Sequence, residues 1–139
     1  MRYVIDVNIL ISSLIKDSLT RKIILESELE LFFPEISYMK IIEHKDYILK
    51  KASLDDKEFF VLLKKAMSHI CLVKKEDIEP YWDIAFNLMK NIDEEDSIFI
   101  ATAFALGKNC IIWSDDKHLK KQKAVHIITT KDLVKNLLD

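Results

Sequence analysis

The chain has 139 residues, 50% of them hydrophobic and 32% charged, with a formal net charge of −2 and a pI near 6.1. This length suits one domain over residues 1–139, and the composition excludes a disordered or a fibrous protein. Because so small a charge provides no overall field for nucleic acid, polyanion binding requires a local patch such as Lys117, Lys120, Lys121 and Lys123.

The elements expected in the first half alternate between strands and helices. In chain order they are a strand at 3–5, a helix at 8–14, a helix from Ser18 or Thr20 to Glu28, a strand at 30–33 stopped by Pro34, a helical stretch at 36–51, a helix capped by Ser53 or Asp55, and a strand at 70–73. Asp6 and Asn8 follow the first strand directly.

The second half continues the alternation. Its expected elements are a helix at 76–90, a helix at 94–106 begun by Asp93 and ended by Gly107 in a left-handed C-cap, a strand at 110–113, a short helix at 116–121, a strand at 125–128, and a helix capped by Thr130 that ends near Leu138. This order predicts an α/β fold, a three-layer α/β/α arrangement around a mainly parallel five-stranded sheet.

Both cysteines lie in apolar runs, at Cys71 and Cys110, which predicts buried free thiols and a reducing, intracellular setting. The N-terminal apolar run is interrupted by Asp6, Asn8 and two serines, so we expect no signal peptide. The sequence contains no run of about 18 apolar residues, so we expect a cytoplasmic protein without a membrane span.

Acidic residues stand at the ends of several expected elements. Asp6 closes the first strand, Asp96 opens the most apolar helix, and Asp115 and Asp116 follow the fourth strand. In a parallel sheet, strand carboxyl ends and the N-termini of the following helices share one edge, so these carboxylates are expected to meet there. Crowded carboxylates repel unless a hard divalent cation neutralises them, which predicts a metal site.

Each acid also has a purely structural interpretation. Asp6 fits an N-cap, Asp93 followed three positions later by Asp96 resembles a capping box, and the Asp115–Asp116 pair fits a turn or N-cap. By spacing alone, Glu43 is a solvated partner of neighbouring lysines in its helix. The residues by themselves leave both interpretations open.

Other catalytic classes find little support in the sequence. Its four histidines show no HExxH spacing, and its single glycine leaves no glycine-rich phosphate loop. Ser12, Ser13 and Ser114 have no placed histidine and acid partner, which argues against a serine hydrolase.

Taken in order, the motifs resemble the PIN-domain family of nucleases, which includes the VapC-type toxins of prokaryotic toxin–antitoxin pairs. Within this family, the resemblance is to proteins of the archaeal type. Residues 4–12 resemble the family's opening strand and loop, and Glu43 stands where its helical glutamate is expected. Residues 93–101 are similar to its acid-plus-alanine helix start, and 113–119 match its last acidic motif. One departure is Val7, which replaces a hydroxyl residue common in the family.

The resemblance implies hydrolysis of RNA phosphodiester bonds with Mg²⁺ or Mn²⁺, through one cation or two about 3.5 to 4 Å apart. Asp6 and Asp96 would be the central ligands, and Glu43 and Asp116 would complete the metal-binding and catalytic set. The alignment of the last motif favours Asp116 over Asp115 as the fourth acid, and a one-residue shift would exchange them. Supporting roles are expected for Asn8, Ser12, Asp93, Ser114 and Asp115.

The partners implied by the resemblance are an RNA substrate, an antitoxin protein and a second copy of the chain, with the homodimer surface at 82–89 and no membrane. The alternative is a catalytically weak PIN-like RNA-binding or assembly module, which the near-neutral charge and Val7 leave open. The presence of all four acids argues against it, because such crowded charge is costly without a cation. A flap-type DNA nuclease would need further helices for which the length leaves no room.

Overall fold

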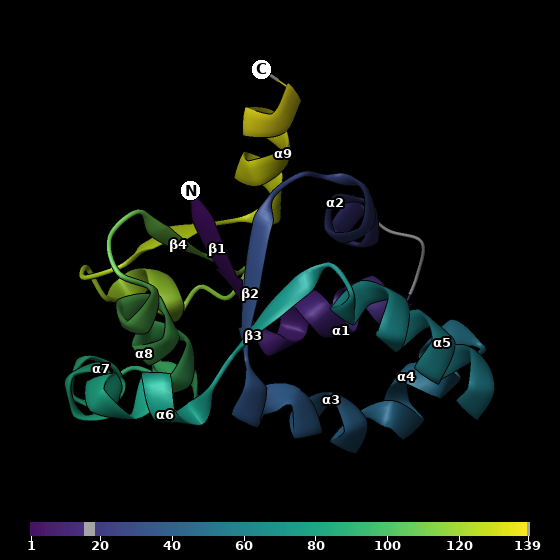
Figure 1. The fold of residues 1–139 in the computed structure, drawn as a ribbon, viewed down its shortest axis with the longest axis horizontal. Helices are drawn as coiled ribbons and strands as arrows, with labels where there is room; N and C mark the ends of the chain where they lie inside the picture. The colour runs from purple at the N-terminus through teal and green to yellow at the C-terminus, as the bar shows by residue number, and fades with distance from the viewer. Residues whose placement is uncertain (16–18, 139) are drawn as a thin grey trace.

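The computed structural model describes residues 1–15 and 19–138. At its centre lies one sheet of five strands, β1 (Arg2–Ile5), β2 (Glu30–Pro34), β3 (Ile70–Val73), β4 (Cys110–Trp113) and β5 (His126–Ile128). Their order is β3-β2-β1-β4-β5, and all four pairings are parallel, with Ile5 opposite Trp113 in the central pair (Figure 1). This arrangement confirms the α/β fold expected from the sequence.

Helices cover both faces of the sheet, which makes the three layers. They are α1 (Val7–Ile15), α2 (Leu19–Glu26), α3 (Tyr38–Glu43), α4 (Lys45–Ala52), α5 (Asp56–Met67), α6 (Lys75–Ile78), α7 (Trp82–Met89), α8 (Ser97–Leu106) and α9 (Thr130–Leu138). Helix α1 packs against α2, α3, α4 and α5, whereas α8 packs against α6, α7 and strands β1, β2 and β4. Figure 1 shows these two groups on opposite sides of the sheet.

The core follows from the central strands and α8. Val4 and Ile5 of β1 are fully buried, because parallel strands covered on both faces have no solvent side. Helix α8 is buried from Ser97 to Ala103, as its nearly continuous apolar sequence predicts. Across the described residues, the helices are all too short or too polar to cross a lipid bilayer.

Several helix boundaries differ from the expected ones. The stretch expected at 36–51 is interrupted at His44, whose backbone (φ −92°, ψ 7°) leaves the helical region between α3 and α4. The helix expected at 76–90 is divided by a 3-10 turn over Glu79–Tyr81, where Pro80 lacks the amide that a continuing α-helix needs. Only Leu119–Lys121 of the helix expected at 116–121 is helical, as a 3-10 turn.

Strand β2 ends at Pro34, as expected, but includes Pro34 itself, which pairs in register with Val73, so the strand is one residue longer than predicted. Of the two proposed starts of α2, Ser18 lies outside the described residues. Cys71 is exposed and Cys110 is partly buried, which corrects the expectation of two buried thiols.

The capping residues were partly predicted. Asp55 caps α5 in a capping box with Glu58, in which Asp55 Oδ1 accepts from the Glu58 amide at 2.8 Å. Ser53 instead ends α4, with φ 55°. At the start of α9, the Thr129 hydroxyl accepts from the Asp132 amide at 3.2 Å, so Thr129 takes the capping place expected for Thr130. The Thr130 side chain is used elsewhere, which affects the acidic site described below.

Gly107 ends α8 with φ 86° and ψ −157°. The positive φ was expected, but ψ lies outside the left-handed helical region, in a conformation open almost solely to glycine. Since a Cβ there would meet nothing within 4 Å, the strain of a substitution comes from the backbone alone. We expect Gly107→Ala to lower the free energy of unfolding by about 1–3 kcal/mol in urea denaturation. Asn109→Gly, at φ 64°, is the control and should cost little; an equal loss in both would contradict the argument.

Candidate metal centre

Asp6 lies where β1 ends and α1 begins, and its side chain is only 3% exposed. Its Oδ1 accepts from the Ile9 amide at 2.8 Å, and its Oδ2 accepts from the Ser114 hydroxyl. The N-cap interpretation is therefore met, since one oxygen closes the first turn of α1. The other oxygen ties the end of β1 to the residue that follows β4, so the same carboxylate also joins the acidic cluster.

Asp96 lies at the N-cap position of α8 but makes no capping hydrogen bond with its side chain. Its Oδ2 is buried and has no hydrogen-bond partner among the described residues, and the same holds for the neighbouring Ser97 hydroxyl. The capping box that Asp93 and Asp96 resemble in the sequence is not formed, because Asp93 Oδ1 accepts from the Glu95 amide at 3.2 Å and so caps the 3-10 turn over Glu94–Asp96 instead. The side-chain hydrogen bond between Asp96 and Asp116 forms only when one of the two carboxyl groups is protonated. A buried carboxylate oxygen without a donor costs about 1–3 kcal/mol or more, so ionised Asp96 has an unmet need for a ligand.

The two adjacent acids after β4 have different surroundings. Asp115 accepts from Thr130 twice, from the amide at 2.8 Å and from the hydroxyl at 2.7 Å, which fixes it to the first residue of α9. Asp116 faces the cluster, where its Oδ1 accepts from the His118 amide at 2.8 Å. The Asp116 amide donates to the Ser114 hydroxyl at 3.0 Å, which connects it to Asp6.

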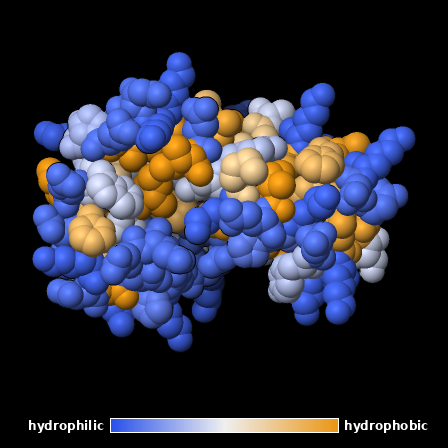
Figure 2. Space-filling view, turned by 90° about the horizontal axis from the view of Figure 1, so that it is seen from below, coloured by the Kyte–Doolittle hydropathy of each residue, from blue (hydrophilic) through white to orange (hydrophobic). Residues whose placement is uncertain are grey.

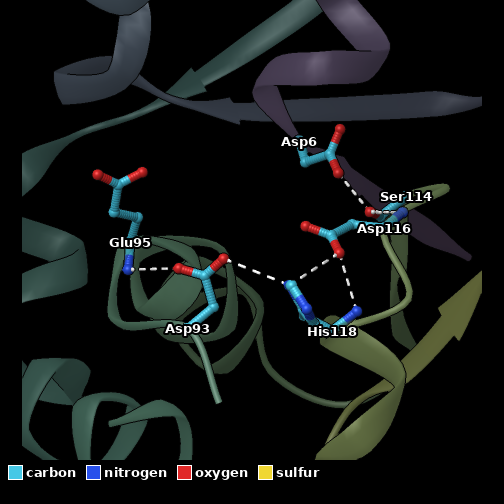
Figure 3. A network of polar contacts seen from close by, with 6 residues as sticks. All are labelled: Asp6, Asp93, Glu95, Ser114, Asp116 and His118. Carbon is cyan, nitrogen blue, oxygen red and sulfur yellow. Dashed lines mark hydrogen bonds and ion pairs between the residues drawn. The ribbon is translucent and has the colours of Figure 1, made fainter. Parts of the chain in front are cut away.

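His118 completes a group that the sequence did not point to (Figure 3). Its Nδ1 lies 3.5 Å from Asp116 Oδ1 and 3.7 Å from Asp93 Oδ2. Each of three residues, Asp93, Asp116 and His118, offers one ligand atom, and these atoms all lie within 4.8 Å of one another. One ion can be held at this spacing. The signal available in the sequence was the histidine two residues after the last acid, which a search for HExxH spacing passes over.

Without a bound cation, the ionised carboxylates of the cluster are electrostatically unfavourable, as the raised pKa values of Asp6 and Asp96 indicate. Burial raises the pKa of Asp6 from the ordinary 3.8 to about 6, although hydrogen bonds oppose the rise. Burial also raises the pKa of Asp96, to about 7, and the negative charges of Asp93 and Asp116 add to it. The donor set is mainly carboxylate oxygen, which hard divalent cations prefer. The buried, partnerless Asp96 oxygen together with this donor set fits such a cation.

A pocket of about 180 Å³ opens beside Asp6 and Asp96. Its lining residues are Asp6, Val7, Asn8, Ser37, Lys40, His44, Glu95, Asp96, Ile98 and Phe99. Glu95 was not among the residues expected from the sequence. The pocket therefore combines carboxylates from β1–α1 and the start of α8 with basic side chains from the end of α3.

Three of the expected site residues lie apart from this centre. Glu43 is exposed at the last position of α3 and does not line the pocket, which Lys40 and His44 line from the same segment. Ser12 is partly buried on α1 outside the pocket lining, whereas Asn8 belongs to it. Asp115 is bound to Thr130. The metal-binding role of Glu43 stays a prediction.

Two of three comparisons with known proteins found a match, one in fold and one in family. None of the curated proteins matches the sequence. A chain of the crystal structure of VapBC2 from Rickettsia felis bound to a DNA fragment from their promoter is similar in fold, with a TM-score of 0.65 at 14% sequence identity. That match covers 93% of this chain and 98% of the other. The model of the PIN domain family matches residues 4–137, and the chain therefore belongs to the PIN domain family.

Proposed function

We propose that the protein is a metal-dependent endoribonuclease that hydrolyses RNA phosphodiester bonds, built as one nuclease domain over residues 1–139. The observation that carries the proposal is the buried Asp96 Oδ2 without a partner, in a cluster that raises the pKa of both Asp96 and Asp6. Membership of the PIN domain family supports nuclease chemistry. The carboxylate donor set favours Mg²⁺ or Mn²⁺ as the ion.

Asp6, Asp96 and Asp116 are the proposed ligands, with Glu43 acting through water because its side chain is exposed outside the pocket. When bound, the ion supplies an electrophile for phosphate oxygens and lowers the pKa of an attacking water. Ser114 holds the Asp6 carboxylate in one orientation by donating its hydroxyl proton to Oδ2. Support of this kind keeps a ligand in place without altering the charge of the site.

Next to these ligands, Asp93 and His118 help to orient the Asp116 carboxylate. The Asp93 carboxylate and the imidazole lie 3.7 Å apart, and the imidazole also lies beside Asp116. An imidazole between two carboxylates restrains both, and it limits their repulsion when it is protonated. We assign His118 to positioning of Asp116.

The protein partners are proposed from the likeness to VapBC2, which supports the toxin of a toxin–antitoxin pair acting in the cytoplasm. Large hydrophobic side chains are exposed on α3, on α7 and in the segment just before α3. They include Ile36, Met39, Trp82 and Ile84. Figure 2, which views the molecule of Figure 1 from below, shows hydrophobic side chains gathered on that face. The exposure of Trp82 and Ile84 supports the proposed homodimer surface at 82–89.

The test is cleavage of a panel of single-stranded and hairpin RNAs by the purified protein with Mg²⁺, Mn²⁺ or EDTA. We expect cleavage with either cation and none with EDTA. Because metal-ion stabilisation of a transition state is worth several kcal/mol, Asp96→Asn should lower the rate on the order of 10²–10³-fold.

Asp77→Asn is the matched control, since Asp77 is exposed on α6 outside the pocket, and it should cleave as the wild type does. Cleavage that persists in Asp96→Asn would indicate a contaminating nuclease and refute the assignment. Measurable Mn²⁺ binding without cleavage of any RNA would favour the binding or assembly module instead.

A further inference from the structure

The pocket beside the acidic cluster is lined by groups of opposite chemistry. They are the carboxylates Asp6, Glu95 and Asp96 and the basic side chains Lys40 and His44, which come from the end of α3. None of these basic groups was assigned a role from the sequence. A pocket lined by both carboxylates and basic side chains suits a negatively charged ligand. One part of such a ligand contacts a divalent cation held by the carboxylates, and another part contacts the basic side chains.

Lys40 is not used to neutralise the acids. It lines the same pocket as Asp6 and Asp96, yet it makes no ion pair within 4.0 Å with any residue in 1–15 or 19–138. Lys45 on the next helix differs, since its ammonium lies 3.3 Å from Asp56. The Lys40 ammonium is therefore available to an incoming anion.

His44 is held in one orientation by the backbone. Its Nδ1 lies 2.7 Å from the carbonyl oxygen of Lys40, and because a carbonyl only accepts, Nδ1 is the donor. This bond fixes the tautomer of the neutral ring and leaves Nε2 as its second polar atom. The spacing of four residues places His44 one turn beyond Lys40, on the same side of the segment.

We propose that Lys40, positioned together with His44, binds a phosphate group of the RNA in the pocket that also contains the carboxylates proposed to hold the metal. The inference rests on the proposed function, because it assigns the substrate contact of that same site. A phosphate that enters a carboxylate-lined pocket is repelled unless cations offset the negative charge of the carboxylates. Lysine serves this purpose as a compact charge that reaches a phosphate oxygen without a fixed geometry.

The experiment measures binding of a short fluorescent single-stranded RNA by anisotropy, with Ca²⁺ replacing Mg²⁺ to retain an oxygen-liganded ion. We expect Lys40→Ala to weaken binding about tenfold, the loss of one charge-assisted hydrogen bond. The slope of log affinity against log salt concentration should become shallower by about 0.7, since one phosphate contact is lost. Lys40→Arg should restore most of both, and His44→Ala should weaken binding with a smaller change in slope.

Two controls separate phosphate binding from a structural effect. Lys50→Ala removes the same charge from an exposed position on α4 outside the pocket, and it should leave affinity and slope unchanged. Mn²⁺ binding by calorimetry without RNA should be no weaker in Lys40→Ala than in the wild type. Three results would each overturn the inference. They are equal losses of RNA affinity in Lys40→Ala and Lys50→Ala, no loss in Lys40→Ala, and a loss of Mn²⁺ affinity in Lys40→Ala that parallels its loss of RNA affinity.

These outcomes differ from failure of the proposed function. RNA binding that depends on Lys40 without any cleavage in Mg²⁺ would refute the nuclease and retain the phosphate contact. Metal-dependent cleavage that is indifferent to Lys40 would refute the contact alone. A wild-type protein that binds no RNA would overturn both.

Discussion

Without metal at pH 8, Asp96→Asn is expected to be more stable than the wild type by about 1–2 kcal/mol. Burial and the nearby charges of Asp93 and Asp116 raise the pKa of Asp96 to about 7, so its ionised form destabilises the fold. Each pKa unit corresponds to about 1.4 kcal/mol, and solvent screening of this partly exposed group reduces the total. The same substitution that is expected to lower the cleavage rate should therefore raise the midpoint of thermal unfolding, by about 3–8 °C.

The difference between the two proteins should depend on pH. The folded-state pKa values of Asp6 and Asp96 lie above the ordinary 3.8, so between about pH 4 and pH 7 the folded state binds more protons than the unfolded state. Stability contributed by these groups accordingly falls as pH rises through this window. The advantage of Asp96→Asn should be largest at pH 8 and should vanish near pH 4.

Thermal unfolding with and without Mn²⁺ completes the test. Cation binding to the folded state should raise the wild-type midpoint at pH 8, and should raise it much less in Asp96→Asn. Asp77→Asn should follow the wild type throughout. An Asp96→Asn variant that is less stable than the wild type at pH 8 without metal would contradict this prediction. It would show that the Asp96 carboxylate already has favourable interactions in the metal-free fold.

The adjacent acids Asp115 and Asp116 are expected to give opposite results when each is replaced by alanine. Asp115 accepts two hydrogen bonds from Thr130 at the start of α9, so Asp115→Ala should lower the free energy of unfolding by about 1–2 kcal/mol. Its cleavage rate should stay near that of the wild type. Asp116→Ala removes a proposed ligand and should lower the rate on the order of 10²–10³-fold, with a smaller loss of stability.

Urea denaturation and initial cleavage rates, measured well below both unfolding transitions, check this pair. Each variant serves as the control of the other, because the two positions are neighbours and undergo the same change. A large loss of activity in Asp115→Ala together with a nearly active Asp116→Ala would reverse the assignment. In that case Asp115 would be the metal ligand, as a one-residue shift of the motif would imply.

The sequence by itself determined the fold class and the approximate position of the acids. Short apolar runs predicted β3 and β4 at their observed bounds. For β4 the reason is burial, since Ile112 and Trp113 lie fully inside the molecule, whereas the edge strand β3 is apolar although Cys71 and Leu72 are exposed. Asp6 and Asp96 were identified because each stands at an element end, and parallel topology brings such ends to one edge. Local pattern and topology rules were sufficient for both conclusions.

Only the tertiary structure decided which side chains share a space. Asp115 and Asp116 are equivalent in the sequence, and only the approach of Thr130 from α9 occupies the first and leaves the second to the cluster. His118 joins the acids and Glu43 lies outside the pocket because loop direction and helix rotation orient them, not spacing along the chain. These orientations depend on packing between elements distant in sequence, which no local pattern encodes.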